Sequence, residues 1–156
     1  MTVRRPKRLP DFPYIGFYRY SLTLATYGRD RFFVAEEPVA EARTQIERTS
    51  EEDQFAVLAY CFMPDHLHLV VEGRAETSDL RRFVRIAKQR TAFVFRTKLG
   101  IPFLWQEGYY ERVLRSDEAT EIVVRYVFDN PVRAGLAQTP WEYPYSGGIF
   151  FGPMRT

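Results

Sequence analysis

Two histidines separated by one residue are the first feature of this sequence that could do chemistry. His66 and His68 flank Leu67 and are the only histidines among the 156 residues. If this segment is a strand, the alternation of side chains places both imidazoles on one face. Two neighbouring imidazoles can bind one divalent ion, but a pair of ordinary half-buried histidines fits the pattern equally well. Because no third histidine exists, a metal site here needs oxygen ligands, which suits Mg²⁺ or Mn²⁺ at least as well as Zn²⁺.

Asp65 and Glu72 are acidic residues close to this pair in the sequence. Alternation along a strand places Glu72 on the face of the two histidines. Asp65 is expected either to point to the other face or to lie in a turn with Pro64.

A tyrosine and an asparagine one helical turn apart form the second candidate group. Tyr126 and Asn130 precede Pro131, and their spacing places them on one side of a helix. If that side meets the metal, Asn130 offers an amide oxygen and Tyr126 a phenol that can attack a phosphate. The alternative is that Tyr126 is a core aromatic and Asn130 simply ends the helix before the proline.

The elements that must position these residues follow from the apolar periodicity, which predicts the order β-α-β-β-α-β-α. Strands are expected over 17–26, 54–63, 66–72 and 109–114, and helices over 36–48, 78–99 and 116–130. Ser78 is expected to cap the second helix, and the third is expected to end before Pro131. The order indicates an α+β fold, a ferredoxin-like sandwich whose antiparallel sheet has its helices on one face and the two histidines on a central strand.

The chain is expected to form a single domain over residues 1–156. A basic, proline-containing arm is expected over 1–13, and an irregular aromatic tail over 137–156. No apolar segment is long enough to span a bilayer, and a single cysteine, Cys61, cannot form an internal disulfide. We therefore expect a protein of the cytoplasm, associated with the nucleoid and not with a membrane.

Basic residues are concentrated in two segments, although the net charge is only +2. The predicted second helix and the N-terminal arm carry the candidate DNA contacts, which are Arg81, Arg82, Arg85, Lys88, Arg4, Arg5, Lys7 and Arg8. No acidic residue interrupts the stretch 80–106, whereas an ordinary solvated helix face mixes both signs. This favours contact with a phosphate backbone over simple solvation.

Four segments of the chain together resemble the HUH-class single-tyrosine transposases of insertion sequences. These segments are YCFMPDHLHLV (60–70), WQEGYY (105–110), YVFDNPVRAGL (126–136) and WEYPYS (141–146). The third segment is similar to the branch associated with repetitive extragenic palindromes (REP). Two positions depart from the pattern, since Glu111-Arg112 stand where relatives often have Asp-His, and Val127 replaces an isoleucine.

The resemblance implies a function and a set of site residues. His66, His68 and Asn130 would bind Mg²⁺ or Mn²⁺, and Tyr126 would attack a DNA phosphodiester to form a 5′-phosphotyrosine. The implied reaction is nicking and strand transfer on single-stranded hairpin or palindromic DNA, by a monomer or a homodimer. Arg133, just after the tyrosine, is expected either to contact the substrate phosphate or to cap the helix.

Other functions fit parts of the same pattern. A domesticated relative would bind hairpin DNA without transposing it, and a metal phosphoesterase would use water as nucleophile and tolerate loss of Tyr126. A replication or mobilisation initiator of the HUH class often carries a second tyrosine on the catalytic helix or a fused helicase, and this chain has neither. Tyr109 and Tyr110 are rival nucleophiles on a predicted strand.

Overall fold

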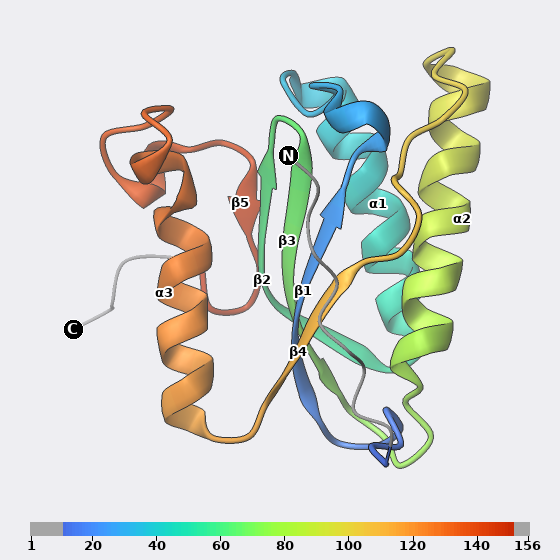
Figure 1. The fold of residues 1–156 in the computed structure, drawn as a ribbon, viewed down its shortest axis with the longest axis vertical. Coiled ribbons are helices and arrows are strands. Elements are labelled where there is room, and N and C mark those ends of the chain that lie inside the picture. Colours follow the sequence, from blue (N-terminus) through green and yellow to red (C-terminus); the bar gives the residue numbers. More distant parts are fainter. Residues whose placement is uncertain (1–10, 152–156) are drawn as a thin grey trace.

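The computed structural model describes residues 11–151 and shows a five-stranded antiparallel sheet with three helices (Figure 1). The strands are β1 (Arg19–Ala25), β2 (Phe55–Met63), β3 (His66–Gly73), β4 (Tyr110–Leu114) and β5 (Ser146–Gly147), in the spatial order β4-β1-β3-β2-β5. The helices are α1 (Glu36–Glu52), α2 (Leu80–Lys98) and α3 (Asp117–Arg133). The α+β fold and the order of the seven predicted elements are confirmed.

The helices cover both faces of the sheet, which corrects the expected one-sided arrangement. α1 and α2 pack on the face that carries Leu67 and Phe62, whereas α3 packs on the opposite face against Cys61 and Met63. Figure 1 shows the sheet with α3 on one side and α1 and α2 on the other. Since β2 is apolar on both faces, both faces need a cover, and a single helical layer would leave one of them in water.

The start of α2 differs from the prediction by one residue. Asp79 is the N-cap, and its carboxylate accepts a hydrogen bond from the backbone N–H of Arg82 at 3.2 Å. The Ser78 hydroxyl instead donates to the backbone carbonyl of Gln54 at 2.8 Å and accepts from the N–H of Ala75 at 3.0 Å. Ser78 therefore fastens the loop before α2 to the turn between α1 and β2, and the adjacent aspartate takes the cap.

The end of α3 also lies beyond the predicted boundary. The helix continues through Pro131 to Arg133, and Gly135 ends it in the left-handed region with φ 75°. A proline has a helical φ, but it lacks an N–H and its ring crowds the carbonyl four residues earlier, so its place in α3 depends on the buried contacts of the last turn. The N–H of Leu136 closes the end by donating to the carbonyl of Pro131 at 2.8 Å.

The tail is not irregular throughout. Ser146 and Gly147 form β5, a short edge strand that pairs with Cys61 and Tyr60 of β2. The buried Tyr143 hydroxyl donates to the backbone carbonyl of Phe62 at 2.5 Å, which fixes the tail beside the same strand. In the part of the chain that the structure describes, no helix combines the length and the apolar character needed to cross a membrane.

Candidate active site

The two histidines of β3 lie on the face of the sheet that α3 covers. Leu67 between them is fully buried in the core under α1 and α2, as the alternation predicts. The Nε2 atoms of His66 and His68 are 3.1 Å apart, and the planes of the two rings are perpendicular. Both imidazoles therefore direct the same nitrogen toward one shared point.

The other nitrogen of each ring has a fixed partner. The Nδ1 of His66 is 2.7 Å from a carboxylate oxygen of Asp65, whose second oxygen accepts from the Arg29 guanidinium at 3.0 Å. The Nδ1 of His68 is 3.2 Å from the hydroxyl of Thr23 on β1. Asp65 thus lies in the turn before β3. Such outer partners orient the rings of metal-binding histidines and leave Nε2 for the ion.

The environment keeps both imidazoles neutral near pH 7, which is the form that binds metals. Burial lowers the pKa of His66, although the bond to Asp65 opposes this. Burial, with the nearby positive charges, lowers the pKa of His68 to about 3. Burial alone would raise the pKa of Asp65, but its bonds to His66 and Arg29 hold it below the usual range.

The spacing of the two Nε2 atoms fits a shared divalent ion. Two nitrogens each about 2.1 Å from a metal are about 3.0 Å apart at a right angle and about 3.4 Å apart at the tetrahedral angle. The observed 3.1 Å between His66 and His68 lies in this interval. Two unprotonated nitrogens at this distance repel, so either a proton, in an N–H···N hydrogen bond between two neutral rings, or a cation lies between them. The distance is compatible with both arrangements, and the second is a shared divalent ion.

A third ligand has to come from another residue type. Among residues 11–151, no group of three or more His, Cys, Asp or Glu side chains is arranged to hold a metal ion. Figure 1 places the C-terminal end of α3 at the same end of the sheet as the turn between β2 and β3, where the histidines lie. Asn130 belongs to this end of α3 and is half-buried, so its amide oxygen is the candidate that the fold offers.

Tyr126 and Asn130 share one side of α3, as their spacing predicts. Tyr126 is 56% exposed, so it is not a core aromatic, and Asn130 does not end the helix, which runs to Arg133. The alternative interpretation of this pair is therefore wrong. The guanidinium of Arg133 lies 3.9 Å from the centre of the Tyr126 ring and donates to the Asn130 side-chain oxygen at 2.9 Å. Within the described chain, no hydrogen bond or ring contact joins Tyr126 to either histidine.

The rival tyrosines occupy different faces. Tyr109 packs against the core under α1 and α2. Tyr110 begins β4 opposite Thr23, which is itself opposite His68, so Tyr110 lies on the histidine face two strands away. Two strand spacings are about 10 Å. Tyr110 is therefore the second candidate for the nucleophile.

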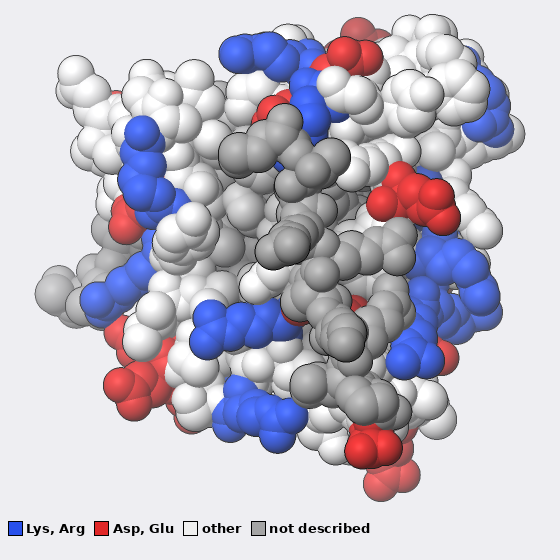
Figure 2. Space-filling view, in the orientation of Figure 1, with Lys and Arg blue, Asp and Glu red and all other residues white. Residues whose placement is uncertain are grey.

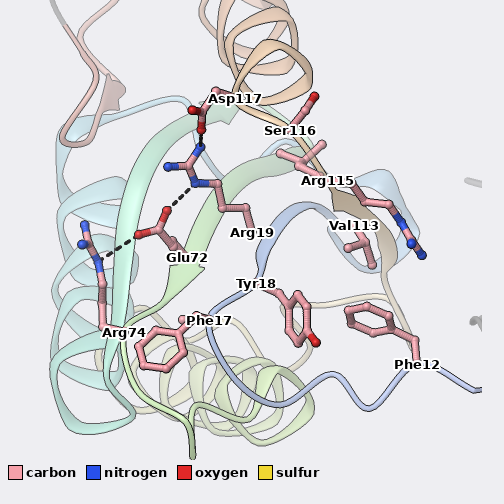
Figure 3. Close-up of a pocket in the computed structure, with 12 residues that line it drawn as sticks. Phe12, Phe17, Tyr18, Arg19, Glu72, Arg74, Val113, Arg115, Ser116 and Asp117 are labelled. Atoms are coloured by element: carbon pink, nitrogen blue, oxygen red, sulfur yellow. Dashed lines mark hydrogen bonds and ion pairs between the residues drawn. The ribbon is translucent and has the colours of Figure 1, made fainter.

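The acidic residue predicted on the histidine face lies at the far end of the sheet. Glu72 pairs with Arg19 and with Arg74 beside a pocket of about 620 Å³ (Figure 3). In the same view Arg19 also reaches Asp117 at the start of α3, at 2.7 Å. Glu72 thus ties β1, β3 and the loop after β3 together and does not belong to the histidine group.

The basic residues of α2 are not brought together with the histidines, because α2 packs on the other face of the sheet. Arg82 pairs with Asp53 at 3.6 Å, the Arg81 guanidinium lies 4.9 Å from the ring centre of Tyr14, and Arg85 is exposed. Lys88 donates to the backbone carbonyls of the 106–108 loop at 3.0 and 2.9 Å.

The four basic residues of the N-terminal arm, Arg4, Arg5, Lys7 and Arg8, lie outside the described residues. Figure 2 shows Lys and Arg side chains scattered among acidic and neutral ones over α3, the β4 edge and the α2 side.

Two residues of this site were not predicted from the sequence. Thr23 and Arg29 hold His68 and Asp65, yet they lie more than 35 residues away from these partners in the sequence. The pairing register of β1 with β3 brings Thr23 opposite His68. Only knowledge of that register would have identified Thr23, and no local pattern indicated Arg29.

Comparisons with known proteins agree with the resemblance. The family model described as "Transposase IS200 like" matches residues 17–130. A REP-associated tyrosine transposase of Haemophilus influenzae is 26% identical over 148 residues, covering 87% of this chain and 81% of the relative. One of Escherichia coli is 26% identical over 107 residues, or 67% and 61% of the two chains.

Solved structures share the fold. A REP-associated tyrosine transposase bound to a REP hairpin matches with a TM-score of 0.75 and 18% identity, over 100% of this chain and 94% of that one. A transposase structure from Deinococcus radiodurans matches with a TM-score of 0.53 and 20% identity, over 80% and 97%. Because the family model spans most of the described chain, the protein belongs to the IS200-like transposase family, and its relatives are REP-associated tyrosine transposases.

Proposed function

We propose that this protein nicks and rejoins single-stranded DNA through a covalent bond to Tyr126, with a divalent ion held by His66, His68 and Asn130. The observation that carries the proposal is the 3.1 Å convergence of the two Nε2 atoms on the face that α3 covers. The exposed Tyr126 stands one turn from Asn130 on that helix. Family membership supports the same reaction.

The proposed step is a transesterification. The Tyr126 oxygen attacks the scissile phosphorus, a bond from phosphorus to the phenol oxygen forms, and the bond to the 3′ oxygen breaks. The phenol loses its proton, and the released 3′ oxygen gains one. The products are a 5′-phosphotyrosine and a free 3′-hydroxyl, and attack by another 3′-hydroxyl reverses the step on a new strand. The chemistry that bound Mg²⁺ or Mn²⁺ supplies is polarisation of the phosphate oxygens.

The proposed substrate is a DNA hairpin with a flanking single strand. The support is that a solved relative with the same fold is bound to a REP hairpin. The cations of α2, such as Arg81 and Arg85, lie on the other side of the sheet from the histidines. A hairpin that contacts them therefore has to extend past an edge of the sheet, while its flanking strand reaches Tyr126. This arrangement needs a substrate with both a stem and a tail.

The test is an assay for the covalent intermediate. The protein is incubated with end-labelled hairpin oligonucleotides from the DNA that flanks its gene, in Mg²⁺ or Mn²⁺, and run on a denaturing gel. We expect a shifted protein–DNA band that disappears with EDTA and with Tyr126→Phe, which retains hairpin binding. Tyr110→Phe is the matched control, since Tyr110 lies on the same face of the sheet, and it should keep the band.

The other outcomes identify the alternatives. A band that survives Tyr126→Phe and is lost with Tyr110→Phe moves the nucleophile to β4. Cleavage without any covalent band indicates that water attacks. Tight, salt-sensitive hairpin binding without cleavage by the wild-type protein indicates a DNA-binding module that no longer transposes.

A further inference from the structure

Arg133 makes three contacts with the two α3 residues of the proposed site. Its guanidinium lies 3.9 Å from the ring centre of Tyr126, and one of its nitrogens donates to the backbone carbonyl of Tyr126 at 2.9 Å. The same nitrogen donates to the side-chain oxygen of Asn130, also at 2.9 Å. Arg133 thus contacts both the nucleophile and the third ligand of the proposed reaction.

The contact with Arg133 fixes the orientation of the Asn130 amide. A guanidinium has donors and no acceptor, so the end of the amide that faces it has to be the oxygen. The amide nitrogen, Nδ2, therefore points the other way. It is buried and has no hydrogen-bond partner within residues 11–151.

The buried side of α3 packs on the face of the sheet that carries the histidines. Val127 and Pro131, which flank Asn130 on the helix, are buried. Val127 belongs to the same core as Cys61, and Cys61 pairs with His68 in the sheet. An amide nitrogen cannot bind a metal ion, whereas the amide oxygen can, and that oxygen is the atom that Arg133 holds.

We propose that Arg133 is a positioning residue that holds the Asn130 amide oxygen on its guanidinium and so withholds it from the ion that His66 and His68 would share. The oxygen becomes a ligand of that ion only when its bond to Arg133 breaks. This inference rests on the proposed function, because it takes Asn130 as the third ligand.

The first test measures metal affinity without DNA and without catalysis. Mn²⁺ is titrated into the protein, and free Mn²⁺ is followed by electron paramagnetic resonance. We expect Arg133→Ala to lower the dissociation constant about fivefold, because one hydrogen bond has a net value of that order. Arg125→Ala is the matched control, since Arg125 is an exposed arginine of the same helix that pairs with Glu121 at 2.8 Å. It should leave the dissociation constant unchanged.

A double-mutant cycle separates the bond from the charge. Removing any positive charge near the site strengthens the binding of a cation. This part of the gain in Mn²⁺ affinity persists when Asn130 is already alanine. The part that acts through the amide disappears in the Asn130→Ala background. We expect most of the fivefold gain to disappear there. A gain that persists fully, a weaker affinity in Arg133→Ala, or no change in affinity overturns the proposal.

A second readout follows the amide itself. Asn130 is the only asparagine in the chain, so labelling with ¹⁵N-asparagine gives one side-chain NH₂ group in the spectrum. In the metal-free wild type its protons should exchange slowly because Nδ2 is buried. In Arg133→Ala they should exchange faster, and fast exchange already in the wild type overturns the proposal.

This second readout needs neither metal nor DNA. If Arg133→Ala leaves amide exchange and Mn²⁺ affinity unchanged while the Tyr126 adduct still forms, the inference fails and the proposed function stands. If the wild type forms no adduct but the amide responds as expected, the proposed function fails by itself.

Discussion

Replacing Asp65 by alanine should weaken metal binding without changing His66 or His68, the two proposed histidine ligands. The Asp65 carboxylate accepts from the Nδ1 of His66 at 2.7 Å and from Arg29 at 3.0 Å. Loss of an outer partner of this kind typically costs about 10- to 100-fold in metal affinity. A charge-assisted hydrogen bond of about 1.5 to 3 kcal/mol gives the same range. Because the Asp65 side chain is 29% exposed and water can replace part of the bond, we expect about tenfold.

The assay is again the Mn²⁺ titration of the DNA-free protein. Asp65→Asn should fall between the wild type and Asp65→Ala, since an amide oxygen still accepts from Nδ1 but carries no charge for Arg29. Asp30→Asn is the control, because Asp30 is an exposed acid that directly follows Arg29 in the chain. Wild-type Mn²⁺ affinity in a folded Asp65→Ala would refute the reasoning that the carboxylate orients His66 for the metal.

Two further predictions concern the stability of the fold and the binding of hairpin DNA. Gly148→Ala should lower the free energy of unfolding in urea by about 3 kcal/mol, because its φ is 111° and an added Cβ would lie 2.7 Å from a backbone oxygen. Gly100→Ala, where φ is 67° and nothing lies within 4 Å, should cost only about 1 kcal/mol, and equal costs would contradict the close approach. Lys88→Gln should lower the free energy of unfolding by about 1 kcal/mol, because Lys88 loses its hydrogen bonds to two backbone carbonyls. Arg85 is exposed, so Arg85→Gln should leave the free energy of unfolding unchanged. It should weaken hairpin binding and reduce the salt dependence of that binding. The two quantities are measured by urea unfolding and by fluorescence titration with hairpin DNA. If Lys88→Gln weakened only hairpin binding and Arg85→Gln lowered only stability, Lys88 would contact DNA and Arg85 would stabilise the fold.

The sequence by itself determined the local geometry of the site. Side chains alternate along any strand, so His66 and His68 share a face whatever the rest of the chain does. Tyr126 and Asn130 share a helix side for the same kind of reason. The order of the predicted elements and the apolar faces also follow from periodicity alone, which is why the α+β class was predictable.

Helix boundaries were predicted less well where two residues compete for one role. Asp79 and Ser78 are both good caps, and the position of Gln54 decides that Ser78 is used elsewhere. Pro131 stops a helix in most contexts, but here it is buried in the last turn and Gly135 sets the end. Such choices depend on contacts with segments that are distant in the sequence.

Only the tertiary structure decided which residues meet. Both faces of β2 are apolar, so the sequence left open on which face α3 packs, and that choice alone places Asn130 on the side of the histidines. The strand register brings Thr23 to His68, and the turn before β3 joins Asp65 to Arg29. Contacts of this kind form between segments that no local periodicity relates, so they are fixed only when the whole core packs.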